Sequence, residues 1–197
     1  MVARLEGKAR NRAALLDAAR DVIVEEGHRG ASLGMIAGRA GLTTGAIYSI
    51  FGSKRDLLVA VVEDIHWRVI AELRQLGDPR LGLEQVIGVY VHGRLRAAGT
   101  KEAAQLLAFE MELAGQAQSD PVVSTRLREI AQRSDQQFAE ALVGRADKNG
   151  AVIGPERARQ LALGIGALVQ GFEQRRLRGE DVPDQLVVDL SVALARQ

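Results

Sequence analysis

Residues 32–58, SLGMIAGRAGLTTGAIYSIFGSKRDLL, decide how this chain is interpreted. The pattern predicts two short helices joined by a tight turn and followed by the capped start of a third. Ser32 can cap the first helix, and the apolar residues that follow it recur at helical spacing. Gly41 ends that helix, because glycine readily takes the left-handed conformation common after a helix C-terminus. Thr43 caps the second helix, which is too short to be stable without neighbours.

The second helix has two different faces. Its apolar side buries Ile47 together with Ile50 or Phe51. Its other face carries small or hydroxylated residues: Thr44, Gly45, Tyr48 and Ser49. A helix with one buried face and one short polar face suits insertion into the major groove of double-stranded DNA.

The third helix opens with a capping box formed by Ser53 and Asp56. Lys54 then lies in its first turn, where the helix dipole disfavours a cation. A DNA phosphate would explain this lysine, and an ordinary solvated surface lysine is the alternative. We expect Thr43, Tyr48 and Lys54 to contact phosphates, and Thr44 and Gly45 to contact the groove. The full set of expected DNA-binding residues is Ser32, Thr43, Thr44, Gly45, Tyr48, Ser49 and Lys54.

Residues 10–58 resemble the DNA-binding domain of the TetR (tetracycline repressor) family of bacterial regulators. The resemblance lies in AALLDAARDVIVEEG and GASLGMIAGRAGLTTGAIYSIFGSKRDLL. The residues that match the family pattern are Gly45, Tyr48, Phe51, Ser53 and Lys54. Ile50 departs from it, since that position is often His or Tyr in the family. A phosphate contact commonly made there is missing or replaced.

The resemblance implies a homodimer that binds a palindromic operator and responds to an unknown small-molecule effector. In the family the last two helices pair across a two-fold axis, and a ligand cavity lies among helices four to eight. The expected dimer residues are Ile165, Leu168, Phe172, Leu186 and Leu190. The candidate cavity residues are His66, Trp67, Tyr90, His92, Phe109 and Met111, with ordinary core packing as the alternative for each.

The whole chain is predicted to be all-α, with about nine helices. After a polar arm at residues 1–9, the expected helices are 10–26, the two described above, 54–76, 78–98, 100–114, 120–146, 154–178 and one beginning near 183. We expect a DNA-binding domain over residues 1–53 and a regulatory and dimerisation domain over residues 54–197. Gly164, Gly166 and Gly171 favour close helix–helix approach at the dimer face, and packing within one subunit is the alternative.

Composition limits the function further. Residues 1–60 hold nine Lys and Arg against six Asp and Glu, a net charge of +3 within a chain of net charge +1. This direction is the one expected for a DNA-binding part joined to another domain. The chain has no cysteine, signal-peptide pattern or apolar run long enough to span a membrane, which favours a cytoplasmic protein.

The sequence offers no arrangement that would support catalysis. The three histidines lack metal-ligand spacing, and the glycines of the eighth helix do not form a dinucleotide-binding motif. We therefore expect no metal, no cofactor and no enzyme activity. The predicted function is a ligand-responsive transcriptional regulator that acts as a repressor. The alternatives are a constitutive DNA-binding or architectural protein without an effector, and a helical-bundle enzyme.

Overall fold

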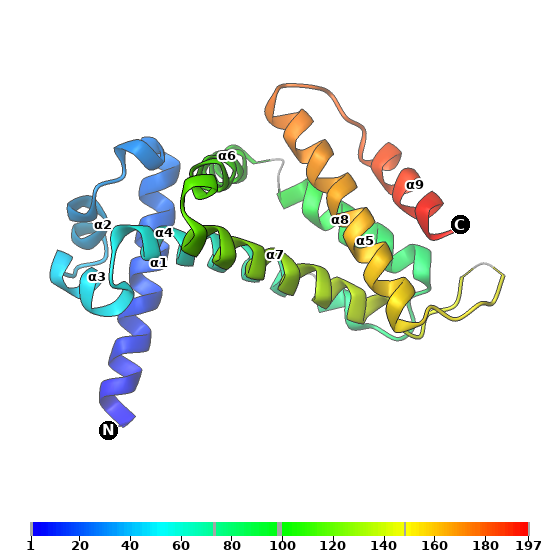
Figure 1. The fold of residues 1–197 in the computed structure, drawn as a ribbon, viewed down its shortest axis with the longest axis horizontal. Helices are drawn as coiled ribbons and strands as arrows, with labels where there is room; N and C mark the ends of the chain where they lie inside the picture. Colours follow the sequence, from blue (N-terminus) through cyan, green and yellow to red (C-terminus); the bar gives the residue numbers. More distant parts are fainter. Residues whose placement is uncertain (1, 73, 98–99, 148, 197) are drawn as a thin grey trace. The chain divides into compact units, whose positions relative to one another are not determined.

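The computed structural model describes residues 2–72, 74–97, 100–147 and 149–196, and these residues form an all-α fold (Figure 1). The helices are α1 (Val2–Gly30), α2 (Leu33–Arg39), α3 (Thr44–Phe51), α4 (Lys54–Glu72), α5 (Leu83–Ala97), α6 (Lys101–Gln116), α7 (Pro121–Leu142), α8 (Pro155–Leu177) and α9 (Asp184–Ala195). Two 3₁₀ turns, η1 (Arg74–Gly77) and η2 (Ala117–Ser119), complete the helical elements. None of the helices in these ranges is long and apolar enough to cross a membrane.

The chain divides into two compact units. Unit 1 comprises Met1–Ile65 and Lys101–Leu127, and unit 2 comprises His66–Thr100 and Arg128–Gln197. The expected boundary after residue 53 therefore differs from the division in the structure. The beginning of α4, all of α6 and the beginning of α7 belong with the predicted DNA-binding part, because α6 packs on α1.

The core of unit 1 is built around one stripe of α1, as the periodicity predicted. Its fully or almost fully buried side chains are Leu15, Leu16, Ala19, Val22 and Ile23. Helices α2 and α3 pack on α1 and on each other and contribute Ile36 and Ile47 to this core. Two helices shorter than nine residues are therefore held by tertiary packing.

Helix α1 departs from the expected bounds at both ends. The arm predicted at residues 1–9 is helical from Val2 onward, because the segment is rich in the strong helix formers Ala, Leu, Arg, Glu and Lys. The predicted stop at Gly27 is confirmed by its backbone, whose φ is 70° and ψ is 161°. A further helical turn follows this kink and leads to the cap of α2.

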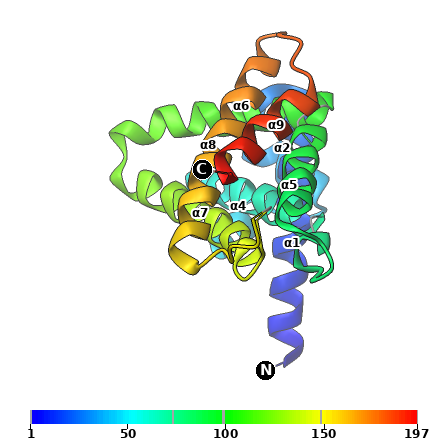
Figure 2. The same cartoon turned by 90° about the vertical axis from the view of Figure 1, so that its right-hand side faces the viewer.

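Unit 2 is a packed group of helices in which α5, α8 and α9 contact one another (Figure 2). Its largest fully buried side chains are Ile87, Leu95, Phe138, Leu142 and Ile165. Helices α8 and α9 begin at Pro155 and Asp184, close to the predicted starts. An isolated bridge between Ala146 and Val152 is the β-type pairing found among the described residues.

Helix α5 was predicted to begin at Asp78 and Pro79, and this prediction is wrong. The helix begins at Leu83 because the preceding residues form a turn held from elsewhere in the chain. The guanidinium of Arg145 donates to the carbonyl oxygen of Leu76 at 2.7 Å, to that of Asp78 at 3.1 Å and also to that of Leu81. Asp78 uses its carboxylate to accept the backbone N–H of Arg80 at 2.9 Å, so it caps a turn.

Candidate nucleic-acid interface

The helix pair α2–α3 is fixed by the two caps that the sequence predicted. The Ser32 hydroxyl accepts the N–H of Met35 at 3.2 Å, and the Thr43 hydroxyl accepts the N–H of Ala46 at 3.3 Å. Gly41 has φ of 66°, so the turn between the helices uses the left-handed conformation expected of a glycine. These local bonds set where α3 begins and therefore which of its side chains face outward.

The outward face of α3 is polar and short. Tyr48 is 54% exposed, and Thr44, Gly45 and Ser49 are also exposed, whereas Ile47 is fully buried on the opposite side. A Cβ placed on Gly45 would meet only the Thr43 hydroxyl oxygen, at 3.6 Å. Packing within the free protein therefore does not require a glycine at residue 45.

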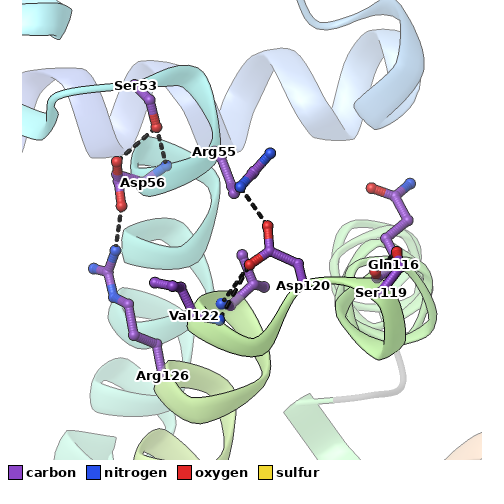
Figure 3. A network of polar contacts seen from close by, with 9 residues as sticks. Ser53, Arg55, Asp56, Gln116, Ser119, Asp120, Val122 and Arg126 are labelled. Carbon is purple, nitrogen blue, oxygen red and sulfur yellow. Dashed lines mark hydrogen bonds and ion pairs between the residues drawn. The ribbon is translucent and has the colours of Figure 1, made fainter.

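The start of α4 lies directly after α3 and carries a network of polar contacts (Figure 3). The predicted capping box is confirmed: the Ser53 hydroxyl accepts the N–H of Asp56 at 3.0 Å and donates to its carboxylate at 2.6 Å. The other carboxylate oxygen of Asp56 accepts Arg126 from α7 at 2.6 Å. One aspartate thus closes the α3–α4 turn and joins it to α7.

Asp120 has the corresponding role at the start of α7. Its carboxylate accepts the N–H groups of Val122 and Val123 at 3.1 and 3.2 Å, and its other oxygen pairs with Arg55 of α4 (Figure 3). The sequence predicted the Ser53 capping box and a helix beginning at residue 120, because the signals that start a helix are local. The two ion pairs join residues more than sixty positions apart, and no local signal indicates them.

Lys54 does not project freely into solvent. Its ammonium donates to the carbonyl oxygen of Ala31 at 2.7 Å, just before the cap of α2. A lysine ammonium has three N–H donors, so two remain for another acceptor. The bond to Ala31 explains how the lysine is held in place and leaves the predicted phosphate contact open.

The residues expected to line a ligand cavity fall in both units. His66, Trp67 and Tyr90 belong to unit 2, and Phe109 and Met111 belong to unit 1. Tyr90 and Phe109 are buried, whereas Trp67 is 53% exposed. His92 lies near the Asp184 carboxylate, at 3.5 Å.

A polar cluster around Tyr90 was not found from sequence. Arg94 donates to both carboxylate oxygens of Glu173, at 3.0 and 2.8 Å, and to the Tyr90 hydroxyl at 3.2 Å. The Tyr90 ring stacks on Phe138 with centroids 3.7 Å apart. Burial raises the pKa of Asp135 nearby, although the charges of Arg94 and His66 act in the opposite direction. Across the described residues, no group of acidic, His or Cys side chains is arranged to hold a metal ion.

The residues expected at a dimer face are not all on the surface. Ile165 is fully buried inside unit 2, because its side of α8 faces the core, so it cannot lie on an exposed face. Leu168 and Phe172 are half-buried, and Leu186 and Leu190 of α9 are 46% and 40% exposed. Leu163, which the sequence prediction missed, is 63% exposed and marks the outward side of α8.

The fold and the α2–α3 geometry define a helix-turn-helix DNA-binding protein. Residues 15–61 match the family described as "Bacterial regulatory proteins, tetR family". Residues 15–61 therefore form a DNA-binding domain of the TetR family, and the chain is a DNA-binding transcriptional regulator.

Curated relatives resemble the chain over most of its length, and solved structures share its fold. The HTH-type transcriptional regulator BetI of Brucella abortus (strain 2308) is 29% identical over 180 residues, covering 86% of this chain and 81% of that protein. A TetR transcription regulator from Haloarcula marismortui has the same fold, with a TM-score of 0.71, 15% identity and coverage of 95% and 97%. The multidrug binding protein EbrR, solved with imidazole, has a TM-score of 0.65, 21% identity and 93% coverage of each chain.

Proposed function

We propose that the protein is a homodimeric repressor that leaves its operator when a small molecule binds. The observation that carries the DNA-binding half of this proposal is the polar, exposed face of α3 between two capped turns. On this basis Thr44 and Gly45 contact the major groove. Thr43, Tyr48 and Lys54 hold phosphates, while Ser32 and Ser49 lie at the edge of the same interface. The protein would act in the cytoplasm, where the chromosome is.

Substitution of Gly45 tests the DNA contact. Gly45 is exposed and a Cβ there would meet only the Thr43 hydroxyl, so Gly45→Leu should fold normally and lose specific binding by blocking the approach to the groove. Gly115→Leu is a matched control, because Gly115 lies on α6 and a Cβ added there would meet no atom within 4 Å. The measurement is binding to a duplex that the full-length protein enriches from a random pool. If Gly45→Leu binds this duplex with native affinity, α3 does not lie in the major groove.

The homodimer is supported by apolar side chains exposed on the outer sides of α8 and α9: Leu163, Leu186 and Leu190. A two-fold axis would present two α3 helices to successive major grooves, about 34–36 Å apart on B-DNA, and would make the operator palindromic. Leu190→Glu would place an unpaired charge in this interface at a cost of several kcal/mol. Sedimentation should give a dimer for the wild type and for the control Val152→Glu, and a monomer for Leu190→Glu.

The effector would bind unit 2 near the Tyr90 cluster. Half-buried ionisable groups with shifted pKa values concentrate at functional sites, and Asp135 is such a group beside Arg94 and Tyr90. In this proposal the dimer has two forms, which differ in the distance between its two α3 helices, and only one form fits both half-sites of the operator. A ligand that binds the other form more tightly lowers operator affinity. A ligand with equal affinity for both forms would leave their populations unchanged.

Trp67 gives a direct test of the switch, because it is the only tryptophan of the chain. Compounds from a small-molecule collection that change its fluorescence should weaken operator binding, with a coupling of about 1–3 kcal/mol. Linkage requires that saturating operator weakens the compound by the same factor. A collection that yields binders but no coupling would favour a constitutive DNA-binding protein.

A further inference from the structure

The basic side chains of unit 1 sort into two groups. Most of its arginines have carboxylate partners: Arg20 with Asp17 and Asp64, Arg29 with Glu112, Arg39 with Glu25, Arg55 with Asp120, and Arg126 with Asp56. Among the described side chains of unit 1, the cations that have no carboxylate partner are Lys8, Arg10, Arg12 and Lys54. Lys54 is bound to a carbonyl, so the other three, all in the first turns of α1, remain to be explained.

Helical spacing separates these three residues. Lys8 and Arg12 are four positions apart and lie on one face of α1. Arg4 has the same spacing in the sequence, although its side chain lies outside the described part of the structure. Arg10 falls on the opposite face, which it shares with Glu6, so the two charges there offset each other. One face of the first turns is therefore basic and the other is neutral.

The basic face of α1 lies next to α3, the helix proposed to enter the major groove. The Arg12 guanidinium lies over the ring of Phe51, 5.5 Å from its centroid, and Phe51 is the last residue of α3. Lys8 lies about 6 Å further along α1, at a rise of 1.5 Å per residue. Figure 1 shows these first turns of α1 extending past α3, and the N-terminal end of α1 projects away from the other helices of unit 1 in both views (Figures 1 and 2).

In the free protein Arg12 contacts the Phe51 ring, whereas Lys8 has no carboxylate partner among the described side chains of unit 1. Like charges four residues apart destabilise a helix. A polyanion that lies against the ridge formed by Lys8 and Arg12 would offset this repulsion. The ridge is attached to the helix that enters the major groove, so the polyanion nearest to it in the complex is the DNA backbone beside that groove.

We propose that Lys8 and Arg12 form a second DNA contact, which holds backbone phosphates next to the groove occupied by α3. This inference rests on the DNA-binding function given above and extends the interface beyond the helix-turn-helix. Phosphate contacts carry no direct sequence information, so the ridge raises affinity for all duplex DNA and leaves the choice of sequence to α3.

The test compares Lys8→Ala with Arg10→Ala, which removes the same charge from the opposite face two residues away. Each variant is titrated with salt on the duplex enriched by the full-length protein and on a scrambled duplex. Loss of one phosphate contact per subunit lowers the salt slope by about 0.9 for each bound subunit. For a dimer, the affinity lost between about 50 and 200 mM salt should then be about tenfold smaller in Lys8→Ala than in the wild type.

The expected result is a reduced slope for Lys8→Ala on both duplexes, an unchanged slope for Arg10→Ala, and recovery in Lys8→Arg. An unchanged slope in Lys8→Ala, or an equal reduction in Arg10→Ala, would overturn the proposed ridge. If the wild type binds the enriched duplex while Lys8→Ala behaves like it, the ridge fails and the DNA-binding function stands. If the wild type enriches no duplex, the DNA-binding function fails first.

Discussion

Removal of Arg94 should destabilise the protein more than removal of its partner Glu173. The two side chains form a bidentate ion pair with 18% and 4% of their surfaces exposed, so each charge depends on the other. Breaking a buried pair by removing one member costs about 3–5 kcal/mol. The two single substitutions are not equivalent, because Asp135 also lies in the field of Arg94.

Arg94→Met leaves two carboxylates, Glu173 and Asp135, without their cation and takes the donor away from the Tyr90 hydroxyl. We expect a loss of about 3–5 kcal/mol. Glu173→Leu leaves the guanidinium beside the remaining carboxylate of Asp135, and that attraction reduces the loss by on the order of 1 kcal/mol. The double substitution Arg94→Met with Glu173→Leu should cost less than Arg94→Met alone, since it leaves only one carboxylate without its cation.

Thermal unfolding at one fixed protein concentration measures the difference. A chain of this size changes its Tm by about 2–4 °C per kcal/mol, so Arg94→Met should lower the Tm by roughly 6–20 °C and Glu173→Leu by at least about 2 °C less. Adding Asp135→Asn to each variant should reduce the asymmetry to the part that comes from the lost hydrogen bond to the Tyr90 hydroxyl. If Glu173→Leu lowers the Tm as much as Arg94→Met does, Asp135 does not share the guanidinium and the reasoning is refuted.

Three further predictions concern the backbone and the acid groups. Gly52→Ala should cost about 1–2 kcal/mol in denaturant unfolding, because residue 52 has φ of 89°. Gly115→Ala, one residue before the end of α6, should instead stabilise by no more than about 0.5 kcal/mol. The hydrogen bond from Arg176 lowers the pKa of Asp184, so the contribution of this carboxylate to stability is lost as the pH falls below about 4. Asp184→Asn should therefore flatten the dependence of stability on pH in that range, and an unchanged dependence would contradict this. Burial raises the pKa of Asp135, so its ionisation opposes folding as the pH rises; Asp135→Asn should raise the Tm at pH 7 by a few degrees at most and leave it unchanged at about pH 3.

The helix-turn-helix could be predicted because its determinants are local. Ser32 and Thr43 cap helices through N–H groups three residues away, and Gly41 gives the turn its left-handed backbone. Such short-range patterns are visible in the sequence, and they fix which residues of α3 face outward. The same holds for the Ser53 capping box at the start of α4.

Features that depend on distant partners could not be predicted. Nothing near Arg94 indicates that its partner lies 79 positions later, and the two ion pairs between α4 and α7 are equally remote in sequence. The start of α5 was misplaced for the same reason. Asp78 followed by Pro79 is a good helix start locally, and a guanidinium 67 positions away makes it part of a turn.

The guanidinium of Arg145 also imposes an order on folding. It supplies donors to carbonyl oxygens 64–69 positions earlier, and closing so long a loop is slow compared with forming a helix. During synthesis α5 leaves the ribosome with only local hydrogen bonds in the turn before it, and that turn gains the bonds from Arg145 only after the end of α7 has emerged. The boundary between η1 and α5 is therefore completed only once residue 145 is available, even though its own residues are made before the midpoint of the sequence.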